Sequence, residues 1–179
     1  MAIPQKLATE LVAASNLISG EGELPAIARK KILQLIEELS SVEHANAGYL
    51  RRARLALICG REFLSHMGPY ADVQGSARMM LAHGFSAISG KCDLKLLQKE
   101  NGNFHTSVVD LFEHGDVAFV AAYAGMATFS AVNTVLYDTN FDLVGENEQN
   151  VPPDDWDASY YASLAVSGSA VWENKVGGE

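Results

Sequence analysis

Residues 117–137 of this chain read VAFVAAYAGMATFSAVNTVLY, a run without a single charged side chain. At helical spacing the run has no polar face, because apolar and small residues occupy every side of the helix. A helix that is apolar on all sides has to be buried on all sides. The sequence therefore predicts a central core helix over residues 116–139, around which the rest of the chain folds.

A membrane span is the alternative interpretation of this run. At about 1.5 Å per residue the helix would be about 30 Å long, which suits both a small domain and a bilayer. Membrane spans usually carry Lys or Arg on the cytoplasmic flank and aromatic belts at both ends. Asp116 and Asp138 flank this run instead, and Thr128, Ser130 and Asn133 lie within it. We therefore expect a soluble core helix and no membrane association.

Two features of the run predict how it packs. An unpaired buried amide would cost about 1–3 kcal/mol, so Asn133 is expected to be buried and hydrogen-bonded, to Tyr or Ser side chains of adjacent helices. Small residues predict close approach by neighbouring helices, and they stand at Ala118, Ala121, Ala122, Ala124 and Gly125.

The composition predicts one intracellular domain. The chain has 179 residues, 48% of them hydrophobic, and no Pro/Gly/Ser-rich linker divides it, so residues 1–179 are expected to form a single domain. The N-terminus lacks a basic region followed by a long apolar run, which predicts a cytoplasmic protein. Cys59 and Cys92 are lone cysteines and are expected to be reduced core thiols.

Helical patterns cover most of the remaining chain. Apolar spacing and capping residues predict helices over 4–19, 25–40, 40–66, 72–90, 93–97, 104–114 and 155–175. The third of these would begin at a Ser40-Ser41-Val42-Glu43 capping box, and Asn101-Gly102-Asn103 would separate the fifth from the sixth. Sustained strand-like alternation is lacking. The predicted fold is therefore an all-α, single-domain bundle of about seven to eight helices around the central helix.

The 40–66 helix is rich in arginine, at Arg51, Arg52, Arg54 and Arg61. Such a helix could bind phosphate, but the many acidic residues elsewhere favour internal ion pairs or a solvated face.

Negative charge is concentrated in the last third of the chain. Of 13 Lys+Arg and 22 Asp+Glu, which give a net charge of −9, residues 117–179 hold only Lys175 against nine acids. A loop is predicted at 138–155, too polar and too interrupted by Gly and Pro for an interior helix. The loop and the residues just beyond it hold seven acids, Asp138, Asp142, Glu146, Glu148, Asp154, Asp155 and Asp157. Such a field repels nucleic acid and anionic membranes and attracts basic surfaces.

These carboxylates have other interpretations. Asp155 and Asp157 could simply cap the closing helix. A calcium loop is disfavoured because Gly145 stands at the wrong place for an EF-hand. The five histidines form no zinc or di-iron motif, and no phosphate-binding Gly-rich loop or GxSxG frame is present. We therefore assign no catalytic residue, cofactor or metal.

Two motifs resemble a known family. NVPPDDWDASYYASLAVSGSAVWE, residues 150–173, is similar to the Asp-rich DWDA signature of immunity family five of bacterial polymorphic toxin systems. RRARLALICGREFL, residues 51–64, is similar to the arginine-bearing segment of the same family. The resemblance covers most of residues 25–173. Members commonly continue past the tryptophan with a further Trp-rich helix, whereas the residues after Trp172 here read ENKVGGE.

The resemblance implies an all-helical cytoplasmic protein that binds and silences a cognate toxin. An inhibitor of a nuclease-like toxin needs a rigid scaffold and a carboxylate surface that resembles phosphate. The expected partner is thus a toxin domain with a basic surface, bound by the seven acids. Trp156 beside them is a candidate anchor, because tryptophan is favoured at binding hot spots. That Trp156 only covers the core is the other interpretation.

Two rival functions remain from other classes. One is a metal-dependent or small-molecule enzyme that uses the carboxylates of residues 138–157. The other is a structural protein that forms homo-oligomers, and a homo-oligomer is also left open for an immunity protein.

Overall fold

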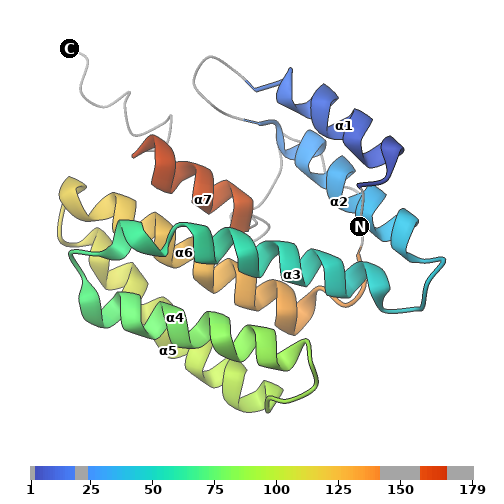
Figure 1. Ribbon diagram of the computed structural model, residues 1–179. Coiled ribbons are helices and arrows are strands. Elements are labelled where there is room, and N and C mark those ends of the chain that lie inside the picture. The colour runs from blue at the N-terminus through green and yellow to red at the C-terminus, as the bar shows by residue number, and fades with distance from the viewer. Residues whose placement is uncertain (1–2, 19–23, 142–157, 169–179) are drawn as a thin grey trace. The chain divides into compact units, whose positions relative to one another are not determined.

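The structure of the protein is a computed structural model that describes residues 3–18, 24–141 and 158–168. Over these residues the chain forms seven α-helices, one 3₁₀ helix and no strand, so the predicted all-α class is confirmed (Figure 1). The elements are α1 (Gln5–Ser15), α2 (Ala26–Ser40), α3 (Ala47–Glu62), η1 (Leu64–Met67), α4 (Ala71–Ala87), α5 (Leu94–Phe112), α6 (Asp116–Tyr137) and α7 (Ala158–Ser167).

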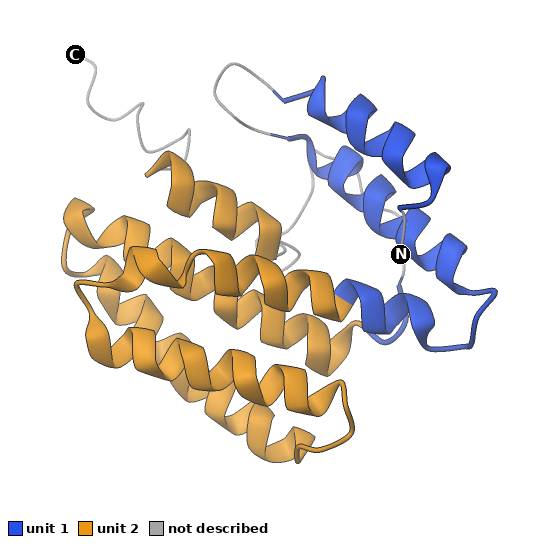
Figure 2. Ribbon diagram, in the orientation of Figure 1, with its two compact units in different colours: residues 1–52, 139–155 blue, residues 53–138, 156–179 orange. Residues whose placement is uncertain are grey.

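The chain divides into two compact units, coloured separately in Figure 2. The first comprises residues 1–52 and 139–155, and the second comprises residues 53–138 and 156–179. The first unit therefore contains α1, α2 and the opening turns of α3, and the second contains the rest of α3 and all later helices. The expectation of one domain over residues 1–179 stays a prediction.

Helix α6 is the core of the second unit. It contacts η1, α4, α5 and α7, so that helices pack on it from several sides. Its length and mean hydropathy of 1.4 would suit a membrane span, but 61% of its apolar window is buried within the protein. The predicted buried central helix is confirmed. It ends at Tyr137, two residues before the predicted end.

Small residues let the helices of the second unit approach α6 closely. A Cβ atom at Gly125 of α6 would lie 2.7 Å from Val108 Cγ2 on α5, closer than side chains tolerate. A Cβ atom at Gly60 of α3 would lie 3.2 Å from the Cα atom of Thr128 on α6. The predicted packing role of Gly125 is thus confirmed, and Gly60 plays the same part from the opposite helix.

Helix α5 lacks the break that the sequence predicted at residues 101–103. It runs without interruption from Leu94 to Phe112, through Asn101-Gly102-Asn103. Asn101 is fully buried, and its Nδ2 atom donates to the Phe129 carbonyl (3.3 Å) and to Asn133 Oδ1 (2.9 Å), both on α6. This tertiary bonding outweighs the weak local helix propensity of the three residues.

Asn133 itself is hydrogen-bonded, as predicted, but it is half-buried and its partner is Asn101 rather than a Tyr or Ser side chain. The neighbouring aromatic His105 of α5 stacks on Phe129 of α6 with ring centroids 4.2 Å apart. Polar and aromatic contacts therefore join α5 to α6 along one face.

The predicted capping box at residues 40–43 is also wrong. Ser40 is the last residue of α2, where its hydroxyl donates back to the Ile36 carbonyl, and α3 begins only at Ala47. Glu43 binds Arg51 instead of a helix N-terminus. The cap predicted for the next long helix at Asp72 is displaced, since Asp72 lies inside the first turn of α4. The cap at Asp93 is confirmed, because its carboxylate accepts the Lys95 and Leu96 amides.

Cys59 and Cys92 are both thiols, and both are half-buried rather than enclosed in the core.

Candidate functional site

The acidic site predicted from the sequence lies mostly outside the described residues. Asp138 is the one predicted site residue within them, at the C-terminal end of α6, where its amide donates to the Thr134 carbonyl (3.2 Å). The others fall in 142–157, and they are Asp142, Glu146, Glu148, Asp154, Asp155, Trp156 and Asp157. The structure does describe the residues that precede and follow this segment in the sequence.

A buried cation fixes the residue that leads into the acidic segment. Phe141 lies under the Arg52 guanidinium, whose carbon is 4.6 Å from the ring centroid. Arg52 is only 2% exposed, and it forms an ion pair with Glu37 of α2. Cation–π contacts strengthen when the cation is desolvated, as it is here. Within the first unit, the Arg52 guanidinium of α3 therefore contacts both α2 and Phe141. We call Glu37, Arg52 and Phe141 the anchor cluster.

Gly48 makes room for the anchor cluster. It lies one turn before Arg52 on α3, and a Cβ atom there would collide with the Glu37 carboxylate. Residues four apart share a helix face, so Gly48 and Arg52 together form the surface that receives Glu37. Any larger residue at position 48 would push Glu37 away from the guanidinium.

The neighbouring Arg51 closes the turn between α2 and α3. Its guanidinium donates to Ser40 Oγ (2.7 Å) and pairs with Glu43 (2.5 Å). Arg61 pairs with the adjacent Glu62 at 3.4 Å. The interpretation of the arginine-rich helix as a source of internal ion pairs is therefore confirmed for these residues. The anchor cluster was missed in the sequence analysis. Its only local sign in the sequence is the spacing of four residues between Gly48 and Arg52, which places both on the face of α3 that meets Glu37.

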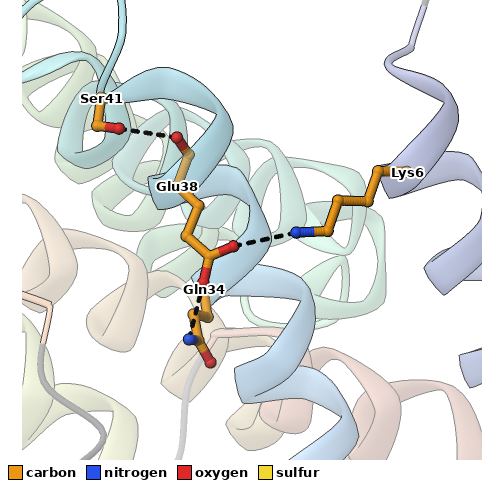
Figure 3. A network of polar contacts seen from close by, with 4 residues as sticks. All are labelled: Lys6, Gln34, Glu38 and Ser41. Carbon is orange, nitrogen blue, oxygen red and sulfur yellow. Dashed lines mark hydrogen bonds and ion pairs between the residues drawn. The ribbon is translucent and has the colours of Figure 1, made fainter.

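Exposed polar contacts fasten α1 to α2 in the same unit. Figure 3 shows Glu38 accepting from Lys6 (3.3 Å) and Gln34 (2.9 Å), while its carbonyl accepts from Ser41 (2.8 Å). Lys31 of α2 also pairs with Glu10 of α1, at 2.9 Å. These groups are largely solvated, so each pair contributes little, about 1 kcal/mol or less.

The residues that follow the acidic segment are held by the core of the second unit. Helix α7 begins at Ala158, directly after Asp157, and it packs on α6. Its buried residues are Ala158, Tyr160, Tyr161, Ala162, Leu164 and Ala165. The predicted closing helix is present in this described part. It ends at Ser167, and the φ of 81° at the following Gly168 is the left-handed conformation that terminates helices.

Within residues 3–18, 24–141 and 158–168, no group of three or more His, Cys, Asp or Glu side chains could hold a metal ion. His83 of α4 pairs with Glu100 of α5 at 2.9 Å, which joins two helices of the second unit. What the described geometry does provide is a contact that holds Phe141 within the first unit and, separately, the packing of α7 on α6 within the second.

The sequence was compared with models of known protein families, and a match covers nearly the whole chain. Residues 9–178 match the model of the family described as Immunity protein Imm5, which is nearly the whole chain. No curated protein matches the sequence.

Proposed function

Because the chain belongs to the Imm5 family of immunity proteins, we propose that it binds a cognate bacterial toxin and neutralises it. The observation that carries this proposal is the extent of the family match, which covers residues 9–178 and so includes most of both compact units and the whole acidic segment. The proposed mode of action is binding rather than catalysis, carried out in the cytoplasm, where the toxin would act on the producing cell or its kin.

The recognition surface in this proposal is the acidic segment. Nine acids against one lysine in residues 117–179 would attract a toxin with a basic surface, such as a nuclease that binds phosphate. The anchor cluster supports this assignment. Its ion pair holds Arg52, and the cation–π contact of Arg52 holds Phe141, one residue before Asp142. Trp156 would supply the short-range contact.

Binding kinetics against the toxin domain encoded beside this gene would test the surface. Changing Asp142→Asn, Glu146→Gln and Glu148→Gln together should slow association and flatten its salt dependence, because exposed charges act mainly on encounter rates. Trp156→Ala should instead speed dissociation, with a loss of about 2 kcal/mol or more.

A matched control removes three exposed acids elsewhere, with Glu62→Gln, Asp72→Asn and Asp116→Asn. This control should leave the association rate near that of the unchanged protein. If both triple variants associate equally fast at low salt, the acidic segment is not the recognition surface. Failure of the unchanged protein to protect cells that express the toxin would overturn the function itself.

A further inference from the structure

Asn101 and Gly102 form the only Asn-Gly dipeptide in the sequence. In such a pair the backbone nitrogen of the glycine can attack the side-chain carbonyl carbon of the asparagine, because glycine has no Cβ atom to hinder the approach and bends freely. Packing does not explain this glycine. Gly102 is exposed in the middle of α5, and a Cβ atom built on it would meet nothing within 4 Å among the described residues.

The folded protein holds Asn101 in an arrangement that prevents the attack. Asn101 is 1% exposed, and its Nδ2 atom donates to the Phe129 carbonyl and to Asn133 Oδ1, so both amide hydrogens have acceptors. In an α-helix each backbone N–H points along the axis toward the carbonyl four residues earlier, which directs the Gly102 nitrogen away from the Asn101 side chain. Both the side chain and the backbone must therefore be released before the two groups can react.

The reaction itself needs only water. The Gly102 nitrogen loses its proton to water or hydroxide and bonds to Asn101 Cγ, the Cγ–Nδ2 bond breaks, and the amine takes up a proton and leaves as ammonia. One water molecule then opens the five-membered imide at either carbonyl. Asn101 thereby becomes aspartate or isoaspartate.

Neither product suits the place that Asn101 occupies. In aspartate an oxygen replaces Nδ2 and faces the Phe129 carbonyl, which cannot donate a hydrogen bond. The second oxygen takes the position of Asn101 Oδ1, which is buried and has no hydrogen-bond partner among the described residues. A buried carboxylate without donors is strongly unfavourable. Isoaspartate adds an atom to the main chain, which interrupts the regular hydrogen bonding of the helix.

We propose that Asn101 is a deamidation site that reacts only while α5 is open, and whose modification destabilises the contact between α5 and α6. The folded chain keeps its amide, whereas a chain that stays open loses it and folds less stably afterwards. The rate of deamidation should follow the fraction of chains in which α5 is open, because opening and closing are fast relative to the chemical step. The proposal concerns the chain alone and does not depend on the proposed function.

Peptide mass spectrometry of the full chain, incubated at mildly alkaline pH with and without guanidinium chloride, would test the reaction. Asn101 should deamidate in the denaturant and at least about a hundredfold more slowly in the folded protein, where α5 is rarely open. Gly125→Ala, which crowds the α5–α6 contact, should raise the rate without denaturant severalfold. Gly102→Ala should slow the reaction in the denaturant by about tenfold or more, because its Cβ atom hinders the attack.

Equal rates in the folded and unfolded chains would overturn the proposal, as would an Asn101 that stays intact in the denaturant. The effect of the product is tested separately with Asn101→Asp. Its matched control is Asn103→Asp, which makes the same charge change at an exposed position of the same helix. Asn101→Asp should lower the melting temperature by about 5 °C or more relative to the control, or prevent folding. Equal melting temperatures of the two variants would show that deamidation does not harm the fold.

Discussion

Glu37 and Glu38 are adjacent on α2, yet their carboxylates lie in different environments. Glu37 faces a guanidinium that is almost completely removed from solvent, whereas Glu38 makes surface contacts with Lys6 and Gln34. A buried arginine stays charged at all relevant pH values, so removing the Glu37 carboxylate would weaken the compensation of that charge. Position within the fold, and not residue type, decides what each carboxylate contributes.

We therefore expect Glu37→Gln to lower the free energy of unfolding by about 2 kcal/mol. This is less than the ~3–5 kcal/mol typical when one partner of a fully buried pair is removed, because about a third of the Glu37 side chain is exposed. Glu38→Gln is the matched control and should cost less than about 1 kcal/mol. Urea unfolding of the two variants would measure both values, and equal losses would contradict the special role of the anchor cluster.

Between elements, the close contact of helices α5 and α6 depends on Gly125 having no side chain. Gly125→Ala would press a Cβ atom against both methyls of Val108, at 2.7 and 2.8 Å, and should destabilise the protein by about 1–3 kcal/mol. Shortening the opposing side chain with Val108→Ala should recover part of this loss in the double variant. Thermal unfolding would show the non-additivity that contacting residues produce.

Gly102→Ala provides the contrast on α5. Space is open around that position, so the substitution should raise the free energy of unfolding by about 0.5–1 kcal/mol. If Gly102→Ala destabilised the protein as much as Gly125→Ala does, the two glycines could not be distinguished by the space around them.

The sequence predicted correctly those elements whose stabilising residues lie close together along the chain. Helix α6 was predicted almost to the residue, because its apolar run and the flanking Gly115 are visible in the sequence itself. The continuity of α5 was missed, because Asn101 is held in the helix by Phe129 and Asn133, which are distant in sequence. The start of α3 was missed for a similar reason, since Ser40 and Glu43 bind Arg51 rather than a helix end.

For the whole molecule, burial predicts a gradient of local stability. Helix α1 has one buried residue, Ala14, and forms the surface ion pairs Lys6–Glu38 and Glu10–Lys31 with α2. Helix α6 is buried along most of its length and contacts four other elements. Regions with few buried contacts open locally at low free energy, whereas core helices open only with the whole fold.

Native-state hydrogen exchange should therefore show the amides of α1 exchanging by local opening, with protection well below that of α6. Glu37→Gln offers a control, because it should weaken the first unit without changing the order of the two helices. Equal protection of α1 and α6 would mean that the two compact units unfold as one.

The residues proposed for the candidate site and their charge could be identified from the sequence. The side chains that hold the neighbouring Phe141 could not. The seven acids and Trp156 are visible as a run without lysine or arginine, and of these residues the structure describes Asp138. The anchor cluster was not predictable, because it joins residues 37, 52 and 141, which are far apart along the chain. Composition can indicate which partner a surface attracts, whereas the side chains that orient the surface become evident only in the folded protein.

The dependence of α6 on α7 also has a consequence during synthesis. A nascent chain leaves the ribosome N-terminus first, so α6 emerges when its α4 and α5 partners are already present and α7 is not. At about 5–20 residues per second, translating residues 138–167 takes a few seconds. During that interval the α7-binding side of the most apolar helix is bare. We expect chaperones that recognise exposed apolar segments to bind the chain at this stage and to leave it once α7 has closed over the core.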